Sequence, residues 1–264
     1  MISPDDDMLT ISRMFDSNVR GRKFEDERTT HDGQEGHWLE RCFGLRANSN
    51  NAPDFPCGRE LKKLSDKITF GDWSASAYLF TNNEHKRSIL TGINGSDFFL
   101  PRVEFIRTFG TPNPDRNNRM SWSGCCFPKY GDWNNCGQKI LLDEENNLHI
   151  KYCPSYDSRL DISNRMVDII GDREKEITIA FWKKTDLKKK VEDKFNQKGF
   201  VIANKDTQGI YISLSFGYPI NFENFCNLLK NKKAILDSGM YETNSRNYSS
   251  FRAAGRVWSE FIYY

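Results

Sequence analysis

Two carboxylates and a lysine lie close together in the segment that runs from residue 54 to residue 62. Side chains alternate between the two faces of a β-strand, so a strand that begins near Glu60 presents Glu60 and Lys62 on one face and Leu61 on the other. Asp54 lies at a turn before this strand, and Gly58 gives the backbone the freedom to bring Asp54 beside Glu60. The sequence therefore predicts that these two acids and the lysine gather at one place.

This group of side chains suits a hard divalent cation. Mg²⁺ takes oxygen ligands and keeps several waters, so one or two protein carboxylates suffice when substrate phosphate completes the shell. A lysine beside the metal can orient or deprotonate a water, and it can stabilise charge that develops on a phosphate. The spacing alone also fits an alternative, a solvated strand with an ion pair on its outer face.

A short amphipathic helix is expected just before this segment, from Gln34 to Phe43. Its apolar side chains recur at helical spacing and would point into a core, and Gly44 provides a plausible C-terminal stop. Glu40 lies near the edge of the apolar stripe. From the residues alone, Glu40 could be a surface carboxylate that pairs with Arg41 or with another nearby basic side chain.

These motifs resemble those of a known group of nucleases. Pro53-Asp54, followed after a short gap by Glu60-x-Lys62, is similar to the signature of the PD-(D/E)XK nuclease superfamily. The helix pattern G-x-x-G-x-x-LE-x-x-FG, at residues 33–44, resembles the MutH-like branch. Three further stretches resemble the MvaI/BcnI family of type II restriction endonucleases, namely an asparagine-rich connector at 48–51 followed by APDF, FIRTFG at 105–110 and SFRA at 250–253. The resemblance covers most of the chain.

The resemblance implies an α/β (α+β) fold of the PD-(D/E)XK restriction-endonuclease type, with a mixed β-sheet flanked by helices and two lobes around a DNA cleft. The break TPNPDRNNR, at 111–119, is expected to separate a catalytic lobe, residues 1–115, from a DNA-recognition lobe, residues 116–264. The implied activity is hydrolysis of phosphodiester bonds in double-stranded DNA at a short specific sequence. Mg²⁺ is the implied cofactor, with Mn²⁺ as a substitute.

The same resemblance implies roles for the clustered residues. Asp54 and Glu60 would bind the metal, helped by the carbonyl oxygen of Leu61. Lys62 would position the attacking water, and Glu40 would lie behind the metal. All four catalytic candidates, Glu40, Asp54, Glu60 and Lys62, are present in the sequence, which argues against a protein that has lost catalysis.

The late stretch from Tyr241 to Arg252 supplies candidates for reading bases. Arginine to guanine is the commonest specific contact, and a carboxylate can accept a hydrogen bond from cytosine. The DNA-binding candidates are Glu242, Arg246, Asn247 and Arg252, together with Arg107 and Arg119. In the resembled family a His-Asp pair commonly precedes the final Phe-Arg, so Arg252 carries over whereas Arg246 and Asn247 do not. A short GC-containing site is expected, and the alternative is that these arginines only hold phosphate.

Hydrophobic periodicity and turn signals predict the remaining elements. Helices are expected at residues 5–19, within 98–109 largely after Pro101, at 183–195 and at 222–229. Strands are expected at residues 75–81, 121–127, 138–142, 148–153, 177–182, 200–203, 210–216, 235–241 and 250–253, with a hairpin turn at 145–147. The strand at 75–81 is expected to pair with the Glu60 strand, and the polar residues 82–97 are expected to form a loop.

The resemblance implies an enzyme of the bacterial or archaeal cytoplasm, and the distribution of charge along the chain is compatible with DNA binding. The chain has 264 residues and a net charge of only +2, but residues 183–198 and 227–264 are locally basic. Such asymmetry fits a protein that grips DNA on one side, and it is also typical of a lysine-rich helix exposed to water. No apolar run approaches the ~20 residues of a membrane span, and the acidic N-terminal stretch is unlike a secretory signal. The seven cysteines are expected to be reduced thiols.

Two rival functions stay open from the sequence. A mismatch-repair nicking endonuclease of the MutH type shares the helix and the Glu-x-Lys strand. A catalytically inactive DNA-binding module belongs to a different class of protein. For the leading interpretation, a restriction enzyme, we expect a monomer with one active site and a cognate DNA methyltransferase in the same system.

Overall fold

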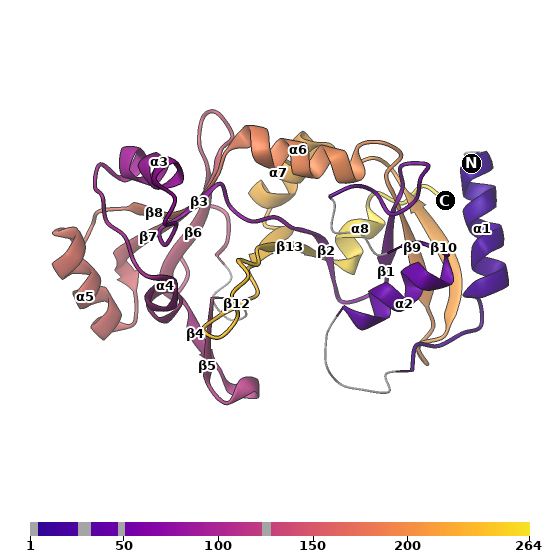
Figure 1. Cartoon of the computed structure of the whole chain (residues 1–264), viewed down its shortest axis with the longest axis horizontal. Helices are drawn as coiled ribbons and strands as arrows, with labels where there is room; N and C mark the ends of the chain where they lie inside the picture. The colour runs from indigo at the N-terminus through magenta and orange to yellow at the C-terminus, as the bar shows by residue number, and fades with distance from the viewer. Residues whose placement is uncertain (1–4, 26–32, 47–50, 123–127) are drawn as a thin grey trace. The chain divides into compact units, whose positions relative to one another are not determined.

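The computed structural model describes residues 5–25, 33–46, 51–122 and 128–264 of the chain (Figure 1). Parts of two expected features, the connector at 48–51 and the strand at 121–127, lie outside these residues. The helices are α1 (Asp6–Asn18), α2 (Gln34–Cys42), α3 (Glu84–Asn94), α4 (Arg102–Phe109), the 3-10 helix η1 (Pro114–Arg116), α5 (Leu160–Ile170), α6 (Lys184–Phe195), α7 (Phe222–Lys230) and α8 (Gly255–Ser259). The strands are β1 (Glu60–Lys63), β2 (Lys67–Asp72), β3 (Ala77–Tyr78), β4 (Thr111–Asn113), β5 (Arg119–Trp122), β6 (Cys136–Leu142), β7 (Leu148–Asp157), β8 (Ile177–Trp182), β9 (Phe200–Lys205), β10 (Tyr211–Gly217), β11 (Ala234–Asp237), β12 (Met240–Tyr241) and β13 (Ser250–Ala254).

Contacts between residues divide the chain into two compact units, each built from segments that are distant in sequence. Unit 1 contains Met1–Ile68, Lys189–Asn224 and Ala253–Tyr264, and unit 2 contains Thr69–Lys188 and Phe225–Arg252. The chain therefore enters each unit more than once, whereas the sequence suggests one break near residue 115. The functional division into a catalytic lobe and a recognition lobe stays a prediction.

A three-stranded sheet, in the order β1-β9-β10, forms the centre of unit 1. β1 pairs with β9 in parallel, with Glu60 opposite Phe200 and Leu61 opposite Val201, and β10 is antiparallel to β9. Paired residues share a face of the sheet. Glu60 and Lys62 therefore lie on the Phe200 face, and Leu61 lies on the other face, as the alternation in the sequence predicts.

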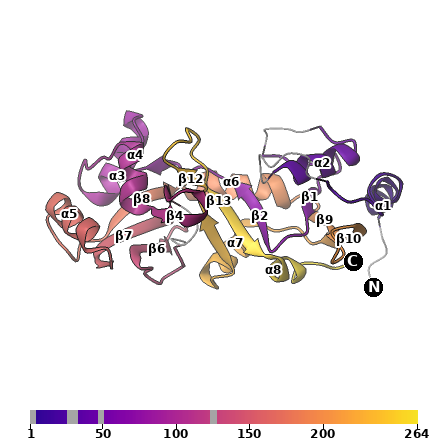
Figure 2. The ribbon, with the colours of Figure 1, turned by 90° about the horizontal axis from the view of Figure 1, so that it is seen from below.

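Different helices cover the two faces of this sheet. On the Leu61 face, a buried cluster joins α1 and α2 to the strands, and it includes Met8, Ile11, Phe15, Leu39, Leu61, Val201 and Phe216. On the opposite face, Trp258 of α8 packs against Phe200 and against Phe195 of α6. Figure 2 shows α2 and α8 on opposite sides of the sheet. β1 is therefore held between two packed layers, which fixes the directions of its side chains.

Three further small sheets, in the orders β3-β8-β7-β6, β12-β5-β4 and β11-β13-β2, lie wholly or mainly in unit 2. The β6–β7 hairpin turns at Asn146, whose φ of 63° lies in the left-handed region, and this confirms the turn expected at 145–147. The described chain is thus mixed α/β, as expected, but it has several small sheets in place of one mixed sheet. None of the helices in the described part of the chain has the length and apolarity that a membrane crossing needs.

The expected helices at 5–19, 34–43, 183–195 and 222–229 are confirmed, with ends that differ by one residue, and the helix expected after Pro101 is Arg102–Phe109. The expected pairing of the strand at 75–81 is wrong. Only Ala77–Tyr78 forms a strand there, and it pairs with β8, whereas β1 pairs with β9. Parallel strands need a long connection, so the partner of β1 lies far along the chain and not in the next strand.

The expected loop at 82–97 is also wrong, because it contains α3. The side chain of Asn83 caps this helix by accepting a hydrogen bond from the backbone N–H of Lys86 at 3.1 Å, and Gly95 follows its last turn with a φ of 64°. Only Leu90 of this helix is buried. Most of the residues of α3 are polar, and its capping residues are also typical of loops. β2, α5 and α8 are absent from the sequence-based expectations.

Candidate active site

Glu60 is the first residue of β1, and its side chain is only 3% exposed. Its Oε1 forms ion pairs with Nζ of Lys62, at 2.9 Å, and with Nζ of Lys194 of α6, at 3.0 Å. A buried carboxylate needs such compensation, because removing an unpaired charge from water is costly. Two ammonium groups on one oxygen leave the other carboxylate oxygen for a different role.

The second oxygen of this carboxylate, Oε2 of Glu60, is buried and has no hydrogen-bond partner among the described residues. Buried polar atoms in folded proteins almost always have a partner, so an orphaned oxygen needs an explanation. A divalent cation is the partner that fits best, because a carboxylate oxygen is the donor type that Mg²⁺ prefers. The atom therefore indicates where a cation would bind.

Asp54 is held at the start of β1 by a hydrogen bond that its Oδ2 accepts from the backbone N–H of Leu61 at 2.9 Å. Burial raises the pKa of Asp54 to about 7, the neighbouring charge of Glu60 adds to the shift, and Lys62 opposes it. Near neutral pH the metal-free protein therefore holds this carboxyl about half protonated. A cation between the two acids would relieve both the burial and the repulsion.

We expect this shift to make the metal-free protein less stable as the pH rises. The folded pKa of Asp54 lies above its unfolded value of 3.8, so the neutral form is favoured in the folded state. The contribution of Asp54 to the free energy of unfolding is therefore fully present below about pH 4, and it is lost as the pH rises through about 7. Urea unfolding in EDTA should show a loss on the order of 2 kcal/mol between about pH 5 and pH 8. Asp54→Asn should remove that loss, and an unchanged pH dependence in this variant would contradict the assignment.

Lys62 lies on the same face as Glu60, with 13% of its side chain exposed and its Nζ 5.4 Å from the ring centroid of Phe195. Burial lowers the pKa of Lys62, and the carboxylate of Glu60 opposes that shift. A lowered pKa makes the ammonium a better proton donor and brings proton exchange closer to neutral pH. The structure thus brings Asp54, Glu60 and Lys62 together, as the sequence predicts.

Glu40 is placed differently from these three residues. Its Oε2 lies 3.2 Å from Nδ1 of His37, one turn earlier on α2, and 23% of its side chain is exposed. Neither Asp54 nor Glu60 is among its contacts in the described part of the chain. In the same part of the chain, no group of three or more His, Cys, Asp or Glu side chains is placed to hold a metal. The role of Glu40 behind the metal, like that of the Leu61 carbonyl, stays a prediction.

Two residues of this region are missed by the sequence analysis. Lys194 belongs to a lysine-rich run that is typical of an exposed helix face, and only the fold brings it to Glu60. Glu35 of α2 binds the opposite side of β1. Its carboxylate accepts hydrogen bonds from Lys63 at 2.8 Å, from Lys205 at 2.9 Å and from the hydroxyl of Tyr211 at 2.9 Å.

The predicted base-reading residues of unit 2 are connected to one another. Glu242 accepts a hydrogen bond from Arg107 at 3.4 Å, and the guanidinium of Arg119 lies 3.4 Å from the ring centroid of Tyr241. Arg246 is 67% exposed and forms an ion pair with Asp72 at 3.1 Å. The candidates Arg107, Arg119, Glu242 and Arg246 are therefore partly engaged within the protein, with Arg246 the most available to a ligand.

The other two candidates are more constrained. Arg252 of β13 forms an ion pair with Asp237 at 3.4 Å and is 34% exposed, while its Nε is buried without a hydrogen-bond partner among the described residues. The side-chain oxygen of Asn247 accepts a hydrogen bond from Arg102 at 2.9 Å. Recognition by these residues stays a prediction.

Known proteins share both the sequence pattern and the fold. The chain matches the family described as LlaMI restriction endonuclease over residues 19–264. It is 39% identical over 268 residues to the type II restriction enzyme ScrFI of Lactococcus lactis subsp. cremoris, and the match covers 96% of each chain. The fold is similar to that of restriction endonuclease MvaI in complex with its cognate DNA substrate. The TM-score is 0.63 and the identity 14%, with 99% of this chain and 98% of that chain covered.

The family match over residues 19–264 and the 39% identity to a type II restriction enzyme place the chain in the restriction-endonuclease class. The chain belongs to the LlaMI restriction endonuclease family, and it is a type II restriction enzyme, an endonuclease that hydrolyses DNA. The resemblance to restriction endonucleases seen in the sequence is confirmed, and its MvaI-like fold is confirmed as well. The matches to restriction enzymes favour this function over the two rivals, a repair nickase and an inactive DNA-binding module.

Proposed function

We propose that this restriction enzyme uses Mg²⁺ to hydrolyse phosphodiester bonds in double-stranded DNA at a short specific sequence, with Mn²⁺ as a substitute metal. The observation that carries the proposal is the orphaned Oε2 of Glu60, which lies next to an Asp54 whose pKa is raised to about 7. A bound cation would give the Oε2 of Glu60 a partner, and it would lower the pKa of Asp54. The cognate DNA in the structure of MvaI supports duplex DNA as the substrate at the level of fold.

In this proposal Asp54 and Glu60 hold the cation, helped by the carbonyl oxygen of Leu61. Bound Mg²⁺ would supply a Lewis acid for the reaction. Lys62, whose ammonium is held beside the acids by its ion pair with Glu60, would orient the attacking water and stabilise the charge that develops on the phosphate. Glu40 supports the site from α2 and does not need to touch the metal.

Plasmid cleavage tests the proposal directly. The purified enzyme with Mg²⁺ or Mn²⁺ should convert plasmid DNA into discrete fragments, because a specific site recurs at fixed positions. Ca²⁺ should support binding but little turnover, since its larger and looser shell holds water and phosphate less well in line. Excess EDTA should stop cleavage, and activity that survives EDTA would refute the metal mechanism.

The same time course tests a second part of the proposal, that the enzyme acts as a monomer. Each chain carries one Glu60–Lys62 site, so one molecule should cut the two strands in succession. At limiting enzyme we expect nicked circles before linear product and a monomer in sedimentation. A dimer that yields linear DNA without a nicked intermediate would overturn this view. Nicks that never become double-strand breaks would favour a MutH-type nickase.

We also propose that Arg252 contributes to recognition of a short GC-containing site. Its ion pair with Asp237 holds the guanidinium but leaves it 34% exposed. Arg252→Ala should weaken cognate binding by ~1–3 kcal/mol and relax discrimination, whereas loss of a phosphate contact weakens all sequences alike. Duplex titrations in Ca²⁺ can compare it with Arg256→Ala on the surface of α8. Equal weakening on cognate and random duplexes would show that Arg252 does not read bases.

A restriction enzyme of this kind threatens the DNA of its own cell. We therefore propose that a cognate DNA methyltransferase protects the same sequence, and that both proteins act in the cytoplasm of a bacterium or archaeon. Cleavage of unmethylated plasmid and resistance of plasmid from a methylating host would support this pairing.

A further inference from the structure

The segment Tyr241–Asn247, which begins at the last residue of β12, carries three of the predicted DNA-reading residues and accepts five hydrogen bonds from a single arginine. Arg102, the first residue of α4, donates from Nε to the side-chain oxygen of Asn247 at 2.9 Å. Its Nη2 donates to the side-chain oxygen of Asn244 at 2.8 Å and to the carbonyl of Arg246 at 3.1 Å. Its Nη1 donates to the carbonyls of Tyr241, at 3.4 Å, and Asn244. All three nitrogens of Arg102 therefore bind this one segment.

The arrangement uses the full donor capacity of Arg102. A guanidinium has five N–H donors and no acceptor. The five acceptors in the segment match these donors, so no N–H of Arg102 is left for a phosphate or a base. Because Arg102 can only donate hydrogen bonds, it also determines the orientation of the side-chain amide of Asn247. The side-chain oxygen faces the arginine, and the amide NH₂ group, which has no partner among the residues that the structure describes, can donate to an acceptor on a base edge.

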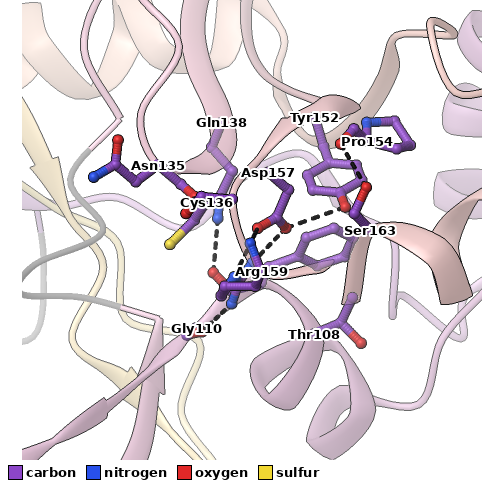
Figure 3. A network of polar contacts seen from close by, with 12 residues as sticks. Thr108, Gly110, Asn135, Cys136, Gln138, Tyr152, Pro154, Asp157, Arg159 and Ser163 are labelled. Carbon is purple, nitrogen blue, oxygen red and sulfur yellow. Dashed lines mark hydrogen bonds and ion pairs between the residues drawn. The ribbon is translucent and has the colours of Figure 1, made fainter. Parts of the chain in front are cut away.

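α4 is anchored at its other end, as Figure 3 shows. Gln138 of β6 donates to the carbonyl of Phe109 at 2.7 Å, and Arg159 donates to the carbonyl of Gly110 at 2.7 Å. Arg159 is itself fixed by a two-pronged pair with Asp157, at 2.9 and 2.7 Å, whose side chain is fully buried. The C-terminal end of α4 is thus tied to the β6–β7 hairpin, and Arg102 projects from the opposite end of a fixed helix.

We propose that Arg102 is a positioning residue for sequence discrimination, which holds Tyr241–Asn247 in the conformation that presents Glu242, Arg246 and Asn247 to DNA. The inference rests on the proposed recognition role of this segment. Arg102 acts through the segment and does not contact DNA itself. Its loss therefore affects which sequence is bound and not how strongly the backbone is held.

Arg102→Lys tests the proposal, because lysine keeps the positive charge but cannot reproduce the planar arrangement of five N–H donors. The probes are duplexes with the site mapped from wild-type plasmid fragments, with single-base changes in that site, and with random sequence. Binding is measured in Ca²⁺ over a range of salt, well below the unfolding temperature. We expect the ratio of cognate to single-base-changed affinity to fall by about tenfold or more, with random-duplex affinity and salt slope unchanged. Arg87→Lys is the control, since its guanidinium binds the exposed Asp97 in the same unit.

Two other outcomes of the binding experiment would contradict the proposed role of Arg102. A salt slope reduced by about one with an unchanged ratio would make Arg102 a phosphate contact. An unchanged ratio and slope would deny it any role in binding. If Arg102→Lys fails to fold, Asn244→Ala removes one of the five acceptors of Arg102, together with the side-chain contacts of Asn244 to Tyr241 and Gly239, and must lower the ratio. In the folded proteins, Arg102→Lys and Asn244→Ala should not add in the double variant. Wild-type enzyme that fails to discriminate would instead refute the proposed function, whatever Arg102 does.

Discussion

Asp54→Asn is expected to reduce DNA cleavage by a factor on the order of 10³ while the enzyme stays folded and still binds DNA. The substitution keeps the shape of the side chain and an oxygen that can accept the hydrogen bond from the backbone N–H of Leu61. It removes the negative charge that a cation needs, and with it the repulsion toward Glu60 that helps to raise the pKa of Asp54. The variant therefore separates metal chemistry from folding.

Single-turnover cleavage, DNA binding in Ca²⁺ and thermal unfolding in EDTA measure the three properties separately. Asp66→Asn is a suitable control, because this acid is exposed and lies between β1 and β2 in the same unit. It should cleave DNA at close to the wild-type rate. Turnover by Asp54→Asn that resembles the wild type would refute the role of Asp54 as a metal ligand.

Lys62→Met should also abolish most of the activity, by more than about a hundredfold, because charge stabilisation in a transition state is typically worth ~3 kcal/mol. Methionine retains an apolar stem that can pack near Phe195, and Lys194 continues to neutralise Glu60. The folded state should therefore survive the loss of the ammonium group.

The matched control for this experiment is the next residue. Lys63→Met removes a lysine from the same strand but from the opposite face, where Glu35 keeps its contacts with Lys205 and Tyr211. Cleavage at saturating DNA should fall only severalfold. If both variants were equally inactive, distortion of β1 would explain the loss, and a chemical role for Lys62 would lose its support.

The local part of the proposed active site can be predicted from the sequence. Strand alternation places Glu60 and Lys62 on one face, and the turn before the strand brings Asp54 to the backbone of Leu61, as the structure confirms. Such features depend on residues close in sequence, whose geometry is set by the backbone. The fold class, mixed α/β, follows from the same local patterns.

The distant partners cannot be predicted in this way. Lys194 reaches Glu60 only because α6 precedes β9, the parallel partner of β1, and nothing in the lysine run itself marks this position. Arg102 is likewise an ordinary helix-start residue until Asn244 and Asn247 are folded against it. Interactions of this kind depend on tertiary structure, and residues far apart in sequence determine them together.

The parallel pairing of β1 with β9 also sets the order in which the enzyme can mature during synthesis. Glu60 leaves the ribosome early, but its neighbours Lys194 and Phe200 are added much later. At translation rates of about 5–20 residues per second, the delay is on the order of ten seconds. Until then the chain carries the acids and lysine of the proposed active site without the sheet that aligns them. With this active site, a growing chain should be unable to cut DNA until most of its length has been made.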